Sequence, residues 1–217
     1  MHFEILVEDI SGKASLEILV PKIIGNEHTF HIHAYKGIGR IPKDLKGTSD
    51  PKKRILLDQL PRLIRGYGKT FAGYRDYPAV LIVVCDLDSR CLSAFRRELL
   101  DLANRCTPKP ETSFCIAVEE GEAWYLGDLI AVKRAFPHAK DTVLNLYRND
   151  SICDTWEQLA DALFSGGARK LSQLGYKMVG IEKKTWAEKI SPHMDVDGNL
   201  SPSFCYFRDK LRRLSSQ

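Results

Sequence analysis

Three groups of carboxylates directly follow apolar stretches of the sequence, an arrangement that suits metal chemistry. They are Glu8 after FEILV, Asp86 and Asp88 after AVLIVVC, and Glu119, Glu120 and Glu122 after SFCIAV. Carboxylates this close repel one another unless they are protonated or neutralised, and a divalent cation with oxygen ligands is the usual solution. Mg²⁺ fits best because it binds a few carboxylates and keeps water ligands for chemistry. The pattern therefore predicts a divalent-metal site, with solvated turns after strands as the alternative.

The stretches that precede these carboxylates have the composition of strands. Residues 3–7 and 113–118 are short apolar runs, and residues 28–35 alternate in the manner of a half-buried strand. Residues 79–85 are continuously apolar and β-branched, which is typical of a parallel strand covered on both faces. Ligands of open α/β sheets gather at the carboxyl ends of the strands, so we expect the three acidic groups to meet at one edge.

Apolar residues at helical spacing separate the predicted strands. They indicate helices over residues 16–24, 55–67, 92–102 and 123–135. Pro21 is expected to kink the first helix and Pro61 to interrupt the second. The order β-α-β-α-β-α-β-α predicts an open, mainly parallel α/β sheet flanked by helices within residues 1–150. Residues 151–217 contain short helical patterns, which predict a C-terminal helical extension packed on the same domain.

The composition is that of an ordinary globular protein with room for one core. The 217 residues are 44% hydrophobic and carry 32 Lys and Arg against 28 Asp and Glu. The small net charge of +4 conceals a local excess, because residues 36–75 hold eleven basic and three acidic side chains. A basic periphery around an acidic centre suits a metal-dependent enzyme that acts on a polyanion. Solvated helix faces are the alternative interpretation of these charges.

The cysteines and the apolar segments indicate a cytoplasmic protein. The six Cys have no CxxC spacing, and several lie inside apolar runs, as expected of free thiols in a reducing compartment. No stretch approaches the ~18 apolar residues that a membrane helix requires. The first residues, MHFEILVED, lack the basic region of a signal peptide. We therefore expect no membrane association.

One competing motif is the segment LIRGYGKT, residues 63–70, which ends like a phosphate-binding loop. That loop requires a Gly where this chain has Leu63, and it must leave a strand. The residues before Gly68 have helical periodicity instead. The sequence therefore argues against a P-loop ATPase.

A second competing motif is the group His28, His31 and His33. His31 and His33 share one face of a predicted strand and could bind a transition metal. No Cys or carboxylate lies within three residues of His31 or His33 in the sequence. A solvent-facing pair on an edge strand is therefore the favoured interpretation.

The acidic motifs carry a resemblance to a known family. ILVED, VVCDLD and EEGEAW follow the order of a Toprim domain, in which a Glu follows the first strand and a DxD follows a later one. With LPRLIRGY, TWEQLADAL and KKTWAEKISPHMDVDGNLSPSF, the chain resembles the Toprim-like domain of unknown function 4276 over nearly its whole length. The resemblance implies a Toprim fold, a divalent-metal site and kinship with the overcoming-lysogenization-defect nucleases, which are often associated with ATPases and phage defence. Many Toprim motifs place Gly after the first Glu, where this chain has Asp9.

The resemblance also implies roles for individual positions. The acidic ones are Glu8 for the Toprim Glu, Asp86 and Asp88 for the DxD, and Glu120 and Glu122 for the downstream acidic motif, with Glu119 the weaker choice. Glu8, Asp86 and Asp88 would be catalytic, and all five would bind metal. The candidate phosphate contacts are Lys184 before the SPSF segment and Arg62 and Arg65 in LPRLIRGY.

Together these features predict hydrolysis of phosphodiester bonds in nucleic acid, with DNA favoured as substrate. One or two Mg²⁺ or Mn²⁺ ions would activate a water and stabilise the leaving oxygen. An ATPase partner and a role in phage defence or DNA maintenance follow from the resemblance. A topoisomerase or a primase is disfavoured, because 217 residues do not hold their additional domains and no zinc module is visible. The alternative is a non-catalytic subunit that docks on an ATPase or on nucleic acid.

Overall fold

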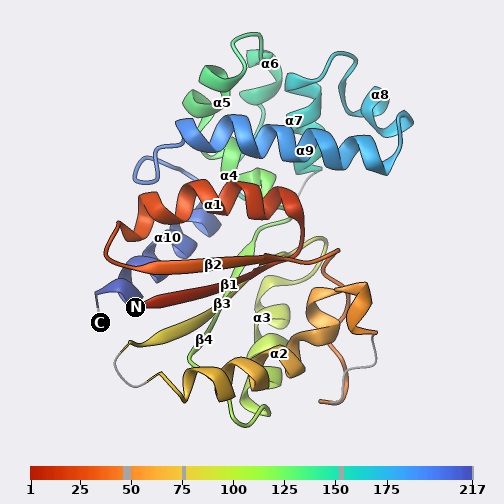
Figure 1. Ribbon diagram of the computed structural model, residues 1–217. Coiled ribbons are helices and arrows are strands. Elements are labelled where there is room, and N and C mark those ends of the chain that lie inside the picture. Colours follow the sequence, from red (N-terminus) through yellow and green to blue (C-terminus); the bar gives the residue numbers. More distant parts are fainter. Residues whose placement is uncertain (46–49, 75–76, 152–153, 217) are drawn as a thin grey trace.

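The centre of the fold is a four-stranded parallel sheet. The computed structural model describes residues 1–45, 50–74, 77–151 and 154–216. The strands are β1 (His2–Val7), β2 (Thr29–Ala34), β3 (Ala79–Asp86) and β4 (Thr112–Ala117), arranged in the order β2-β1-β3-β4 (Figure 1). All three strand pairings in the described residues are parallel. The predicted α/β class, with an open parallel sheet flanked by helices and a C-terminal helix, is confirmed.

Three helices connect these strands and cover both faces of the sheet. They are α1 (Ile10–Ile24), α2 (Leu56–Phe71) and α3 (Leu92–Asn104). Phe3 and Ile5 of β1 are buried on the α1 side, whereas Leu6 is buried on the side of α2 and α3. This double burial explains why β3 is apolar along almost its whole length.

The strand order places a topological switch point between β1 and β3. The chain passes from β1 to β2 in one direction and then crosses β1 to reach β3 and β4 (Figure 1). In such sheets the connecting helices diverge to opposite faces, which leaves a crevice at the carboxyl ends of the two central strands. Val7 pairs with Val84, so Glu8, one residue beyond Val7, and Asp86, two residues beyond Val84, both lie at this crevice.

Pro61 does not interrupt α2, contrary to the sequence prediction. The helix runs from Leu56 to Phe71 with Pro61 buried inside it, and α1 likewise continues through Pro21 to Ile24. Burial of the apolar face of α2 against the sheet outweighs the backbone hydrogen bond lost at proline. The segment 63–70 lies wholly in this helix, which excludes a phosphate-binding loop there.

The helix predicted over residues 123–135 is in fact two helices, α4 (Glu122–Leu126) and α5 (Leu129–Ala135). The first ends with Gly127 as its C-cap, and Asp128 caps the second, because its Oδ1 accepts a hydrogen bond of 3.0 Å from the backbone N–H of Ala131. Gly127 fits closely against Asn199, where a Cβ atom would lie 2.3 Å from the Asn199 side chain. The break therefore comes from a cap and a close packing contact.

The C-terminal residues complete the core on the α1 side. The remaining elements are η1 (Pro51–Lys53), α6 (Asp141–Leu144), α7 (Thr155–Leu163), α8 (Gly167–Gln173), α9 (Tyr176–Ile190), η2 (Ser191–His193) and α10 (Pro202–Ser215). Helix α9 packs along α1, and α10 packs against β4 and α1 (Figure 1). Trp186 and Phe204 belong to the same buried cluster as Phe3. Within the described residues, no helix is long and apolar enough to cross a membrane.

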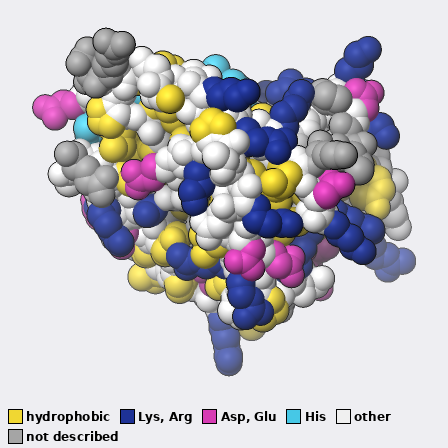
Figure 2. Space-filling view, turned by 90° about the horizontal axis from the view of Figure 1, so that it is seen from below, with side chains coloured by type: hydrophobic (Ala, Val, Ile, Leu, Met, Phe, Trp, Pro, Cys, Tyr) yellow, Lys and Arg dark blue, Asp and Glu magenta, His cyan; other side chains and the backbone are white. Residues whose placement is uncertain are grey.

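The opposite side of the molecule is formed by α2 and α3. Seen from below, it carries Lys and Arg side chains spread among apolar and polar ones (Figure 2). Five cysteines in the described residues are free thiols, of which Cys91 is exposed. The sixth, Cys153, lies outside the described residues.

Candidate functional site

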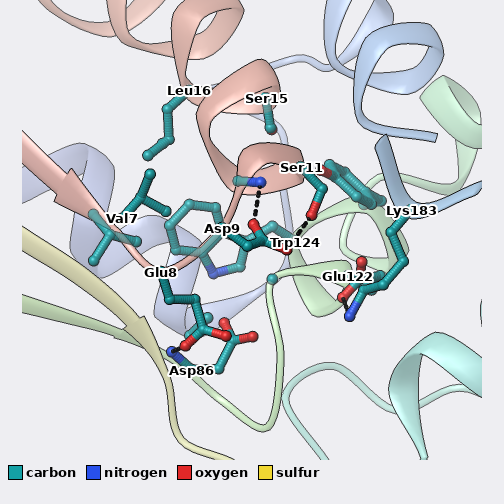
Figure 3. Close-up of a pocket in the computed structure, with 15 residues that line it drawn as sticks. Val7, Glu8, Asp9, Ser11, Ser15, Leu16, Asp86, Glu122, Trp124 and Lys183 are labelled. Atoms are coloured by element: carbon teal, nitrogen blue, oxygen red, sulfur yellow. Dashed lines mark hydrogen bonds and ion pairs between the residues drawn. The ribbon is translucent and has the colours of Figure 1, made fainter. Parts of the chain in front are cut away.

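Glu8 and Asp86 form the centre of an acidic pocket at the switch point of the sheet. The backbone N–H of Asp86 donates a hydrogen bond of 3.3 Å to Oε2 of Glu8. Figure 3 shows the two carboxylates directed into the same space. Val7 and Val84, the last register pair of β1 and β3, line the pocket beneath them. The strand ends therefore bring together two acidic residues that are far apart in the sequence.

Glu122 and Glu120 lie beside this pair and are bound to a lysine. Glu122 begins α4 and is only 3% exposed. The Lys183 ammonium, from α9, lies 3.1 Å from Oε2 of Glu122 and 3.4 Å from Oε2 of Glu120 (Figure 3 shows the contact with Glu122). Lys183 is thus the cation that the protein itself places at the acidic pocket.

Burial governs the protonation of the central pair. It raises the pKa of Glu8 to about 7, an effect that the charges of Asp9 and Asp88 increase and the hydrogen bond from Asp86 opposes. Burial and the charge of Glu8 raise the pKa of Asp86 well above its usual range. Two carboxyls that both resist ionisation, and that repel each other when ionised, gain stability from a bound cation.

The charge of Lys183 opposes the rise in pKa that burial causes at the neighbouring Glu120 and Glu122. Burial raises the pKa of Glu122 to about 7, although the Lys183 charge opposes the shift. Burial also raises the pKa of Glu120, again against Lys183. Burial alone would lower the pKa of Lys183, but Glu122 and Glu120 raise it well above its usual value, which keeps the ammonium charged.

Asp9, which stands where many Toprim motifs have Gly, caps helix α1. Its Oδ1 accepts a hydrogen bond of 2.7 Å from the backbone N–H of Gly12, and its Oδ2 accepts one of 2.6 Å from the hydroxyl of Ser11. A short polar side chain that satisfies free N–H groups in this way stabilises the first turn of a helix. Asp9 is therefore engaged locally, although its charge still acts on Glu8.

Asp88 does not line the acidic pocket. Its backbone has a φ of 49°, in the left-handed region, and its side chain pairs with Arg90 at 2.9 Å. With Glu120 and Glu157 it lines an open hollow next to the acidic pocket. The two acids of the DxD thus occupy different positions, Asp86 in the pocket and Asp88 at its outer side.

Glu119 has a structural role at the start of α7. Its Oε2 accepts a hydrogen bond of 2.9 Å from the backbone N–H of Thr155 and another from the Thr155 hydroxyl. β4 ends at Ala117, one residue earlier than the sequence predicts. Of the three glutamates, Glu122 lines the acidic pocket, whereas Glu119 and Glu120 line the adjacent hollow.

The three basic residues predicted from the sequence lie outside the pocket. Lys184 is half-exposed and pairs with Glu188 at 3.2 Å. Arg62 donates to Gln59, and Arg65 to the Leu45 carbonyl, both from α2 on the other face of the sheet. In the part of the chain that the structure describes, none of the three forms an ion pair with the acidic residues of the pocket.

Lys183 is the basic residue that the sequence prediction passed over in favour of its neighbour. The helix periodicity contained a signal, because Trp186, Ala187 and Ile190 lie three, four and seven residues further on and are all buried. Lys183 therefore shares the inward face of α9, and its long side chain reaches the pocket from that face.

Comparison of the chain with protein-family models, curated proteins and solved structures gave no match in any of the three. The resemblance to Toprim proteins consequently depends on the sequence motifs alone.

The donor set of the pocket fits a divalent cation. The carboxylates of Glu8, Asp9, Asp86 and Glu122 line the pocket together with Lys183, whose ammonium also pairs with Glu120 of the adjacent hollow. Among the described residues no Lys or Arg forms an ion pair with Glu8 or Asp86. Oxygen ligands of this type suit Mg²⁺ and Mn²⁺, and Mg²⁺ commonly binds through one or two carboxylates with water completing its shell. Glu8 and Asp86 are the residues that can hold such an ion.

Proposed function

We propose that this protein hydrolyses phosphodiester bonds in nucleic acid, DNA in particular, with Mg²⁺ or Mn²⁺ held by Glu8 and Asp86. The observation that carries the proposal is that Glu8 and Asp86 line one pocket at the switch point of a parallel sheet, where the backbone N–H of Asp86 donates to the Glu8 carboxylate. Ligands of open α/β proteins bind at this place, and buried adjacent carboxylates favour a cation. Mg²⁺ or Mn²⁺ supplies Lewis-acid activation of water and of the phosphoryl oxygen when bound.

Lys183, Glu122 and Asp88, which lie around Glu8 and Asp86, would each have a different role in this reaction. The Lys183 ammonium, held by Glu120 and Glu122, offsets the negative charge that develops on a phosphate in the pocket. The pKa of Glu122, about 7, suits a group that exchanges a proton near neutral pH. Asp88 offers a further carboxylate at the outer side, where a second ion would bind.

The acidic hollow next to the pocket is a second reason why substrate binding should depend on cations. It is lined by acidic side chains, among them Asp88, Asp154 and Glu157. A polyanion is repelled from such a surface unless cations occupy it. Phosphate contacts farther from the reaction would come from Arg62 and Arg65 on the α2 side, where basic side chains are spread over the surface (Figure 2).

We further propose a Toprim-like nuclease that works in the cytoplasm with an ATPase partner, in phage defence or DNA maintenance. The support is the order of the motifs ILVED, VVCDLD and EEGEAW in the sequence. The free thiols of the five described cysteines suit a reducing compartment. A partner would also supply the positive surface that the acidic hollow lacks.

One observation favours a non-catalytic binding subunit as a second candidate. Lys183 already neutralises part of the negative charge of Glu120 and Glu122. A pocket stabilised entirely by this lysine would need no metal. In that case the fold would dock on an ATPase or on nucleic acid without cleaving it.

A cleavage assay separates the two functions. The purified protein is incubated with plasmid, single-stranded DNA and RNA in Mg²⁺ or Mn²⁺, beside Glu8→Gln, Asp86→Asn and the control Glu17→Gln. Glu17 is an exposed carboxylate on α1 that pairs with Lys13 at 3.5 Å. We expect each pocket variant to lose activity by about 100-fold or more and the control to stay within about twofold of wild type. Cleavage that survives both pocket substitutions contradicts the proposed site, and metal-independent binding without cleavage favours the binding subunit.

A further inference from the structure

A second group of metal-binding side chains lies on the α2 face of the sheet, apart from the acidic pocket. Glu4 of β1 pairs in register with His31 of β2, and the next residues on this face are Leu6 and His33, which also pair. The candidate donor atoms of Glu4, His31 and His33 all lie within 4.8 Å of one another. Within residues 1–45, 50–74, 77–151 and 154–216, this is the one group of three or more such side chains that meets that distance.

The two histidine side chains converge on one carboxylate oxygen of Glu4. Nε2 of His33 contacts Oε1 of Glu4, and Nδ1 of His31 lies 3.5 Å from the same oxygen. The two imidazole rings lie beside each other, with centroids 4.1 Å apart. An ion pair between Glu4 and a single protonated His33 would not require His31 to point at the same oxygen.

Glu4 is held in place by residues that surround it. It is 7% exposed, and its Oε2 lies 3.1 Å from Nε2 of His2. The hydroxyl of Tyr67, from α2, donates a hydrogen bond of 3.1 Å to Oε1, and Nδ1 of His2 contacts the Thr29 hydroxyl at 2.8 Å. Partners of this kind orient metal-binding carboxylates in known metal sites.

We propose that Glu4, His31 and His33 bind a transition-metal ion, with Zn²⁺ preferred. Two imidazoles and one carboxylate suit Zn²⁺, whereas Mg²⁺ prefers oxygen ligands. The His31 side chain is 62% exposed, so the ion enters from solvent and keeps at least one position for water. The bound ion links the edge strand β2 to β1.

The experiment is a Zn²⁺ and Co²⁺ titration of tag-free, metal-depleted protein in excess Mg²⁺. We expect one equivalent of Zn²⁺ to bind, the protein to melt at a higher temperature, and Co²⁺ to give a visible absorption band. His31→Gln should weaken Zn²⁺ binding by about 100-fold and leave the circular dichroism unchanged, because the side chain is mostly exposed. His138→Gln is the matched control, since His138 is also exposed and lies outside the group.

Two further variants test whether Zn²⁺ binds at Glu4, His31 and His33 and not in the acidic pocket. Glu4→Gln should also lose Zn²⁺ affinity, and Asp86→Asn should retain one equivalent bound as tightly as in wild type. The inference is overturned if wild type does not bind Zn²⁺, if His31→Gln binds it as well as His138→Gln does, or if Asp86→Asn loses the ion. The last result would place the Zn²⁺ in the acidic pocket.

Discussion

The backbone N–H of Asp86 lies 3.3 Å from Oε2 of Glu8, and this hydrogen bond joins the carboxyl ends of β1 and β3. The two strands are neighbours in the sheet, and the strand order reverses between them. Two partly buried acidic residues therefore line one pocket at the place where open α/β folds bind ligands. The raised pKa values of Glu8 and Asp86 mean that ionising both carboxyls at this place costs free energy. A bound divalent cation would offset that cost.

Substitution of Lys183 tests how far the protein relies on its own cation. Lys183→Met leaves Glu120 and Glu122 without their partner, and Glu122 is buried. We expect the free energy of unfolding without metal to fall by about 3 kcal/mol, the low end for a broken buried ion pair because Glu122 can take up a proton. Urea denaturation in a chelator measures this change, and Mn²⁺ should restore part of the loss.

Lys184 provides the control for that experiment. It is adjacent on α9, but it is half-exposed and pairs with Glu188 on the surface. Lys184→Met should change the free energy of unfolding by less than about 0.5 kcal/mol. Equal losses for the two lysines would mean that the pocket does not depend on Lys183.

The metal-free protein should lose stability as the pH rises from 4.5 to about 7. The pKa values of Glu8 and Glu122 rise from 4.5 to about 7 on folding, so the folded protein holds protons that the unfolded chain has released. Unfolding is therefore favoured by rising pH in this window, by at most ~1.4 kcal/mol per pH unit for each group.

Urea denaturation in a chelator across that pH range measures the slope. Glu122→Gln should flatten it, because the amide does not titrate, whereas the exposed Glu17→Gln should leave it unchanged. Saturating Mn²⁺ should reduce the decline, since the metal binds the ionised carboxylates. A slope that is the same in Glu122→Gln and wild type would show that this carboxyl does not titrate in the window.

Asp9 should act on stability more than on metal binding. Asp9→Ala removes the cap of α1 and should lower the free energy of unfolding by about 1 kcal/mol. Asp9→Asn keeps an oxygen that accepts from Gly12 and should remain close to wild type. If calorimetry shows that Asp9→Asn weakens Mn²⁺ binding as much as Glu8→Gln does, Asp9 is a ligand and the capping interpretation is incomplete.

The sheet and its acidic edge could be predicted because both follow from local sequence. A continuously apolar run such as residues 79–85 forms a strand buried on both faces, and parallel strands end at the same edge. Glu8 and Asp86 could therefore be placed together without knowledge of the strand order. The hydrogen bond between the Asp86 backbone and the Glu8 carboxylate depends on β1 and β3 being neighbours, which only the structure shows.

The residues that could not be predicted depend on contacts between distant elements. Helical periodicity with Trp186, Ala187 and Ile190 places Lys183 on the inward face of α9, but that this face packs beside the acidic pocket depends on contacts with distant elements. The sequence does not connect Glu4 with His31, because the two are neighbours across β1 and β2 and lie far apart in the chain. The break at Gly127 likewise depends on Asn199, which is distant in the sequence.

The most direct test of the central claim is a Mn²⁺ titration of metal-depleted protein, followed by electron paramagnetic resonance. The account predicts that wild type and Glu17→Gln bind Mn²⁺ equally well, and that Glu8→Gln and Asp86→Asn each bind about 100-fold more weakly. All four proteins should show the same circular dichroism. Undiminished Mn²⁺ binding in both pocket variants, or no binding to wild type, would contradict a metal site at Glu8 and Asp86.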